Sequence, residues 1–177
     1  MRHSVHVNTP QTRLSAGDEG HLVAELRSLK SQRLPRASRA AKALQILEKT
    51  TSSRVRNAAA LALADLRATN AAEVLIDLLT RPDTVGSRGT LLYALEQLKA
   101  DIPLPILADI IVNESYEARE EAVAFIAGNR FECSADEFAS SKAKLEIAAV
   151  SAEAERLQAI RRALGNLSIK HYHNVKR

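Results

Sequence analysis

The residues that could support catalysis or metal binding are few and widely separated. Of the five histidines, only His21 lies away from the ends of the chain. The other four stand in two pairs, His3 with His6 and His171 with His173. Imidazole is a common metal ligand, and the two pairs would share an ion only if the ends of the chain met. We interpret any metal binding there as adventitious and predict no metal site.

Sequence motifs of catalytic sites are also missing. None of HExxH, GxSxG, GxxxxGK or CxxC occurs in the chain. Cys133 is the only cysteine and lies in the acidic stretch FECSADEF, where carboxylates raise the pKa of a thiol instead of activating it. We therefore expect a protein without enzymatic activity or cofactor.

A basic stretch, RSLKSQRLPRASRAAK (27–42), is the most prominent run of charge. It places a basic residue at every third position: Arg27, Lys30, Arg33, Arg36, Arg39 and Lys42. A step of three residues turns a helix by about 300°, so each triplet covers an arc of about 120° that the leucines leave free. We favour a solvated helix face, and an acidic protein surface, nucleic acid or lipid remain as alternatives. No aromatic residues interleave with these charges, as a platform for single strands would need.

The charge of the chain changes sign along its length. Residues 1–67 carry twelve Lys/Arg and five Asp/Glu, residues 68–150 seven and fourteen, and residues 151–177 six and two. An elongated fold would therefore be basic at its start, acidic in its middle and basic again at its end.

Apolar spacing and helix-stop residues predict an all-α chain. An apolar stripe predicts a first helix over 18–33, and no strand of useful length is expected. Further helices are expected near 36–49, 53–67, 71–81, 84–98, 103–112, 116–127, 135–148 and 152–164. Capping boxes are predicted at Asn70 with Glu73 and at Ser134 with Glu137, and helix ends at Gly128-Asn129 and Gly165-Asn166.

The expected cellular compartment is inferred from features that the sequence lacks. The start, MRHSVHVNTPQTRLSAGDEG, contains no apolar run like that of a signal peptide. No stretch of about 20 apolar residues exists that could span a membrane. A single cysteine permits no intrachain disulfide and fits a reducing compartment. We expect a cytoplasmic protein with loose tails at 1–17 and 168–177 and one domain over 18–167.

An internal repeat organises this domain. Four segments begin with Arg and share apolar offsets: RNAAALALADL, RGTLLYALEQL, REEAVAFIAGN and RLQAIRRALGN. Their arginines, Arg56, Arg88, Arg119 and Arg156, stand 32, 31 and 37 residues apart. Shorter apolar helices alternate with these segments. One such helix pair cannot bury its apolar face alone, whereas stacked neighbours share a continuous core. The longer last spacing predicts a loop that bulges out near 128–136.

These segments resemble the short bacterial form of the HEAT repeat, the type also seen in phycobilisome lyase-like proteins. The best match is SSRVRNAAALALADLRATNAAEVLIDLL (52–79). The resemblance covers about 36–167 and implies an α-solenoid of about four helix pairs behind a capping helix at 18–33. It also implies that the repeated Arg bonds with turn residues and carbonyls of the adjacent unit. The iron motifs of HEAT-type hydroxylases are absent, and the acidic middle without Trp does not match HEAT-like DNA glycosylases.

The repeat phase and the resemblance separate core positions from binding positions. Val55, Ala59, Leu63 and Leu66 are expected to point into the core. The concave face of the second helices is expected to bind a partner through Asn57, Leu61, Tyr93, Gln97, Glu120 and Arg161. We predict a non-catalytic protein–protein interaction module, such as an adaptor, regulator or inhibitor. The alternative is a nucleic-acid-binding protein that uses the basic residues at 27–42.

Overall fold

The computed structural model describes residues 15–128 and 131–169, and in these ranges the chain is all α. About 80% of the described residues are helical. They form nine α-helices, three short 3-10 turns and two very short strands. The helices are α1 (Ala16–Ser28), α2 (Arg36–Lys49), α3 (Ser53–Asp65), α4 (Ala72–Thr80), α5 (Gly89–Gln97), α6 (Leu104–Asn113), α7 (Tyr116–Gly128), α8 (Ala135–Ser151) and α9 (Ala154–Ile169). Single 3-10 turns occur at η1 (Leu29–Ser31), η2 (Thr69–Ala71) and η3 (Pro82–Thr84).

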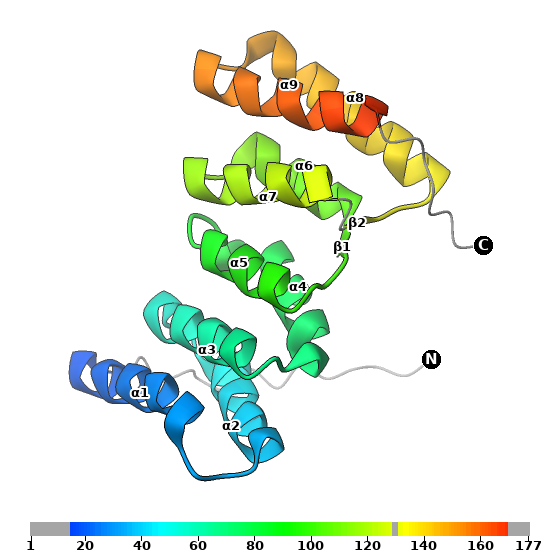
Figure 1. Cartoon of the computed structure of the whole chain (residues 1–177). Helices are drawn as coiled ribbons and strands as arrows, with labels where there is room; N and C mark the ends of the chain where they lie inside the picture. Colours follow the sequence, from blue (N-terminus) through cyan, green and yellow to red (C-terminus); the bar gives the residue numbers. More distant parts are fainter. Residues whose placement is uncertain (1–14, 129–130, 170–177) are drawn as a thin grey trace, which may run out of the picture.

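The odd-numbered helices form a row in chain order (Figure 1). Helix α1 packs on α3, α3 on α5, α5 on α7 and α7 on α9. The even-numbered helices lie behind this row, each packed against the odd-numbered helix that follows it in the chain. Among the described residues, no helix is long and apolar enough to cross a membrane.

Small residues let these helices pack closely. In α3, Ala59, Ala60 and Leu63 are fully buried, and Val55 and Leu66 are buried beside them. The four residues predicted to point into the core do so. Because alanine side chains hold neighbouring axes apart less than bulky ones, a chain with few aromatics still builds a continuous core.

Helix starts agree with the prediction at one capping box and not at the other. Ser134 and Glu137 form the expected box, in which the Glu137 amide donates to Ser134 Oγ at 3.3 Å. Asn70 and Glu73 do not form one. Helix α4 has Ala71 as its N-cap, with no side-chain cap. Asn70 lies inside the η2 turn and therefore cannot occupy the extended conformation of an N-cap.

Helices α3 and α5 end at a left-handed residue that is not a glycine, unlike the glycine stops predicted elsewhere in the chain. Arg67 (φ 50°) and Lys99 (φ 56°) take the left-handed conformation just past α3 and α5. At the next residue in each case, the Ala68 amide donates to the Leu63 carbonyl and the Ala100 amide donates to the Leu95 carbonyl, each at 3.0 Å. These are the bonds of a Schellman motif with Arg or Lys in place of glycine.

Three other predicted boundaries need correction. The helix expected over 84–98 begins only at Gly89, because η3 and the turn at Gly86 (φ 77°) come first. Helix α9 continues through Gly165 to Ile169, so the predicted end at Gly165-Asn166 is wrong. Helix α1 begins at Ala16, so the expected tail 1–17 overlaps it. The predicted stop at Asn129 and most of both tails lie outside the described residues.

Two short strands interrupt the helical pattern, although none was expected. Strand β1 (Ile102–Pro103) pairs in parallel with β2 (Phe131–Glu132), with Ile102 opposite Phe131. Strand β2 lies in the segment that was predicted to bulge out between the third and fourth repeats. Phe131 and Glu132 in this segment pair with β1, which lies in the connection that precedes α6.

Candidate partner-binding surface

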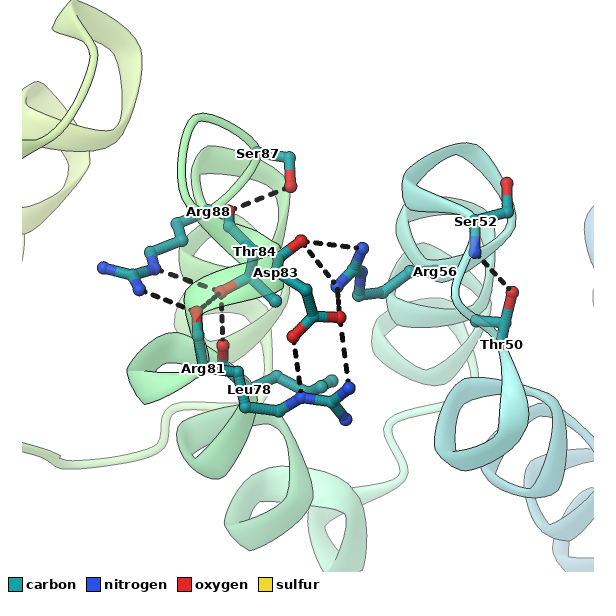
Figure 2. A network of polar contacts seen from close by, with 9 residues as sticks. All are labelled: Thr50, Ser52, Arg56, Leu78, Arg81, Asp83, Thr84, Ser87 and Arg88. Atoms are coloured by element: carbon teal, nitrogen blue, oxygen red, sulfur yellow. Dashed lines mark hydrogen bonds and ion pairs between the residues drawn. The ribbon is translucent and has the colours of Figure 1, made fainter. Parts of the chain in front are cut away.

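Three of the four repeated arginines connect successive odd-numbered helices. Arg56 of α3 is only 2% exposed, and its guanidinium reaches the turn that precedes α5 (Figure 2). There Nη1 lies 3.2 Å from Asp83 Oδ2, and Nη2 donates to the Asp83 carbonyl at 3.3 Å. Arg81 donates to the same carboxylate at 2.9 Å through Nε. Burial raises the pKa of Asp83, but the Arg81 hydrogen bond and the Arg81 and Arg56 charges outweigh it and lower the pKa.

Arg88 repeats this arrangement one unit later. Its Nη2 donates to the Arg81 carbonyl at 2.9 Å and its Nε to Thr84 Oγ1 at 3.1 Å, which fixes the turn before α5. Its Nη1 lies 3.1 Å from Glu114 Oε1 at the end of α6, where the chain turns into α7. An arginine at the start of one odd-numbered helix thus again meets an acid just before the next.

Arg119 completes the series, and Arg156 stands outside it. Arg119 donates to the Glu114 carbonyl at 3.0 Å and lies 3.5 Å from Glu155 in the first turn of α9. We call Arg56, Arg88 and Arg119 with their acids the arginine ladder. Arg156 has the same repeat phase, yet it is exposed and has no ion pair within the described residues. It belongs to α9, the last described helix of the row.

The predicted partner-binding residues lie on the four later helices of the odd-numbered row. Leu61 on α3 and Tyr93 on α5 are 42% and 44% exposed, unusual values for large apolar side chains in the middle of helices. Gln97 is exposed, and Asn57 is partly buried beside Leu61. The structure thus brings exposed apolar side chains to neighbouring helices of one row.

Two of the predicted residues differ in their availability. Glu120 of α7 accepts hydrogen bonds from Arg162 Nη2 of α9 at 2.5 and 2.8 Å, so its carboxylate already has a partner. Arg161 is exposed and makes no ion pair within the part of the chain that the structure describes. Arg162 was not among the predicted residues, because the repeat phase does not indicate which of two adjacent arginines reaches across to α7.

A groove between α1 and α3 adjoins Leu61. It encloses about 370 Å³ and is lined by Val23, Leu26, Arg27, Lys30, Arg54, Asn57, Ala58, Leu61, Ala62 and Asp65. Arg27 on α1 and Arg54 on α3 are exposed and form no ion pair with a described residue. Asn57 Oδ1 is buried there and accepts no hydrogen bond from the described residues. The groove therefore combines apolar lining with two available guanidinium groups.

The six basic residues at 27–42 divide into two kinds. Three have structural partners: Lys30 pairs with Asp65 of α3 at 3.2 Å, Lys42 pairs with Glu25 of α1, and Arg39 donates to the carbonyls of Leu29 and Lys30 at 2.9 and 2.7 Å. The others, Arg27, Arg33 and Arg36, are exposed and unpaired within the described ranges. Half of the basic stretch therefore joins the first three helices together.

Carboxylates gather between α5 and α7, further along the same row. Burial raises the pKa of Glu121, and the charges of Glu96 and Glu117 raise it further. The row thus runs from a basic groove at α1 and α3 to acidic residues at α7.

The remaining chemistry-bearing residue, Cys133, lies beside β2 in a hollow with Asp101, Glu132 and Glu137. Burial and the charge of Glu137 raise the pKa of its thiol, as the acidic surroundings predicted. No group of three or more potential metal ligands occurs in 15–128 or 131–169.

Comparison with known proteins assigns no family. No protein-family model, no curated protein and no solved structure matches the chain.

Proposed function

We propose that the chain is an α-solenoid of HEAT-like helix pairs that binds another protein, without catalysis, through the exposed face of its odd-numbered helices. Support for the solenoid comes from the arginine ladder, which joins neighbouring units by the same kind of contact. Support for the binding face comes from Leu61 and Tyr93, which are exposed on the neighbouring helices α3 and α5. Surface apolar side chains flanked by polar groups are typical of binding sites.

The α1/α3 groove indicates what the partner presents. Its apolar lining accepts an apolar side chain, and Arg27 and Arg54 on its two walls favour carboxylates next to that side chain. Because Lys30 is paired with Asp65, the two arginines carry the available positive charge. The partner segment is therefore acidic with an apolar anchor, and it continues over Leu61 towards Tyr93.

Selection of peptides from a random displayed library tests this proposal. We expect enriched sequences to combine Asp or Glu with Leu, Ile or Phe, and to lose binding to an Arg27→Glu/Arg54→Glu variant. The Leu61→Asp variant should also bind these peptides more weakly. The Val85→Asp variant should bind them like the wild type, because Val85 is exposed outside the groove. Enrichment of sequences without acids, or equal binding to the wild type and the groove variants, would refute the proposed surface.

Nucleic-acid binding is the second candidate, and the three unpaired arginines favour it. Arg27, Arg33 and Arg36 are free to contact phosphates. Titration of labelled duplex DNA and RNA by fluorescence anisotropy should then show an affinity that falls steeply with salt. Substitution of all three arginines by Glu should abolish it. Absence of binding stronger than micromolar at low salt would eliminate this candidate.

A further inference from the structure

A polar hollow of about 590 Å³ lies beside the ends of the neighbouring helices α3 and α5. It shares only Lys30 and Asp65 with the α1/α3 groove. Six of its eight lining residues are polar or charged and none is aromatic: Lys30, Ala64, Asp65, Arg67, Thr69, Gln97, Leu98 and Lys99. This lining suits a charged ligand, in contrast to the largely apolar α1/α3 groove.

The charges of the hollow are unbalanced. Lys30, Arg67 and Lys99 face a single carboxylate, that of Asp65, which gives the lining a net charge of +2. Asp65 lies 3.2 Å from Lys30 and so offsets that cation. Arg67 and Lys99 are exposed and form no ion pair with a described residue. The hollow therefore holds two cationic side chains that are available to an anion.

The backbone at both of these cations is strained. Arg67 (φ 50°) and Lys99 (φ 56°) occupy the same position just past their helices, α3 and α5. Glycine is the usual residue there, because any side chain disfavours the left-handed conformation. The chain instead keeps a long cation at both positions, and both line the same hollow. Strain retained twice for the same kind of side chain indicates a use for the two charges.

The helix ends themselves account for little of this charge. Free carbonyls at the end of a helix attract cations and repel anions. Here the carbonyls of Leu63 and Ala64 in α3, and of Leu95 and Glu96 in α5, each accept a backbone hydrogen bond of 2.9–3.0 Å. Because these carbonyls are already occupied, they compete less for the two cations and repel a bound anion less.

We propose that the hollow binds a phosphate monoester, with Arg67 and Lys99 as the main phosphate-binding residues and Lys30 shared between the phosphate and Asp65. The charge of a monoester phosphate, about −1.5 to −2 at neutral pH, matches the net charge of the lining, whereas a carboxylate would leave one positive charge unmatched. Thr69 and Gln97 are exposed in the same hollow and supply neutral donors for the phosphate oxygens.

The size and lining of the hollow also limit what carries the phosphate. Ligand sites of several hundred Å³ accommodate more than a single ion, so a polar carrier group fits beside the phosphate. A nucleobase finds no aromatic side chain to stack on. The carrier is therefore a small polar group, such as the serine of a phosphoserine. This site goes beyond the proposed partner binding and does not depend on it.

NMR titration of the labelled full chain at low salt tests the site, with O-phosphoserine as the probe and dimethyl phosphate, a diester with a single charge, as the control. Phosphoserine should shift the amide signals of Arg67, Thr69 and Lys99 in a saturable way, and dimethyl phosphate should bind at least about tenfold more weakly. Equal binding of the two, or no saturation by about 10 mM phosphoserine, would overturn the proposal.

Further probes distinguish the sources of the phosphate. Inorganic phosphate and a peptide with an internal phosphoserine are titrated in the same way. Tighter binding of the peptide would assign the site to a phosphorylated protein segment. Equal binding of the peptide and free phosphoserine would assign it to a small phosphate ester. Preference for inorganic phosphate over both esters contradicts a monoester site.

Glycine variants separate binding from folding. Because glycine adopts positive φ without strain, Arg67→Gly and Lys99→Gly remove a cation without disturbing the turn, and their thermal midpoints should not fall below that of the wild type. Each should bind phosphoserine about tenfold more weakly. Arg161→Ala removes an exposed arginine of α9 outside the hollow and should bind like the wild type. Unchanged affinity in both glycine variants, or an equal loss in Arg161→Ala, would contradict the site.

Discussion

Arg88 and Glu114 form an ion pair of 3.1 Å that joins the start of α5 to the end of α6, and the Glu114 side chain is only 1% exposed. The second carboxylate oxygen of Glu114 accepts a hydrogen bond from the Gly86 amide at 2.9 Å. One buried carboxylate therefore holds both the arginine and the turn before α5. Because Arg119 also donates to the Glu114 carbonyl, this residue contacts two steps of the arginine ladder.

Neutralising this carboxylate should destabilise the fold. We expect Glu114→Gln to lower the free energy of unfolding by about 2–4 kcal/mol, because it leaves a largely buried guanidinium without its counter-charge. Urea denaturation followed by circular dichroism measures the loss. Glu48→Gln, at an exposed position of α2, is the control and should change stability by less than about 0.5 kcal/mol. Similar values for the two variants would show that the ion pair is not structural.

The two kinds of basic residue at 27–42 should respond differently to truncation. Arg39→Ala leaves the carbonyls of Leu29 and Lys30 without their donor, so we expect a loss of about 1–3 kcal/mol. Arg36→Ala removes an exposed side chain and should leave the thermal midpoint unchanged. Thermal unfolding of both variants measures the difference. A midpoint for Arg39→Ala equal to that of the wild type would mean that Arg39 belongs with the solvated arginines.

Glu121 should make stability depend on pH in a defined direction. Its folded-state pKa is raised by burial and by Glu96 and Glu117, so ionised Glu121 destabilises the folded state. This penalty is fully present above the folded pKa and disappears as the pH falls towards the ordinary carboxyl value. We expect Glu121→Gln to unfold at a higher temperature than the wild type at pH 7, and the gap to narrow as the pH is lowered through the folded pKa.

A matched variant isolates this effect. Glu73→Gln changes an exposed carboxylate on α4, and its difference from the wild type should not follow the same trend with pH. If Glu121→Gln is less stable than the wild type at pH 7, the carboxylate is favourably paired and its assignment as a destabilising group is wrong.

The sequence predicted the helices well because their cause is local. The Arg-to-Arg spacing and the apolar offsets placed each long helix, and Val55, Ala59, Leu63 and Leu66 are buried as the repeat phase required. The ends of the helices were harder to predict from the sequence. Asn70 has the residue type of an N-cap but lies in a 3-10 turn, and Gly165 was expected to stop a helix that continues past it. Competing turns and tertiary packing decide such boundaries.

Contacts between distant residues could not be read from the sequence. The acids of the arginine ladder, Asp83, Glu114 and Glu155, stand 27, 26 and 36 residues after their arginines, so no fixed spacing identifies them. In the same way, the basic period of three does not reveal that Lys30 reaches Asp65 in another helix while Arg27 reaches no described acid. These pairings depend on how the connecting turns fold.

The arginine ladder is tested most directly by one comparison of unfolding free energies, Arg56→Ala against Arg156→Ala. The two arginines share a repeat phase, but Arg56 is buried and bonded to the turn before α5, whereas Arg156 is exposed and has no ion pair within the described residues. We predict that Arg56→Ala lowers the unfolding free energy by about 2–4 kcal/mol and that Arg156→Ala changes it by less than about 0.5 kcal/mol. Equal losses in the two variants, or no loss in Arg56→Ala, would contradict a stack held together by arginines that reach from one helix pair to the next.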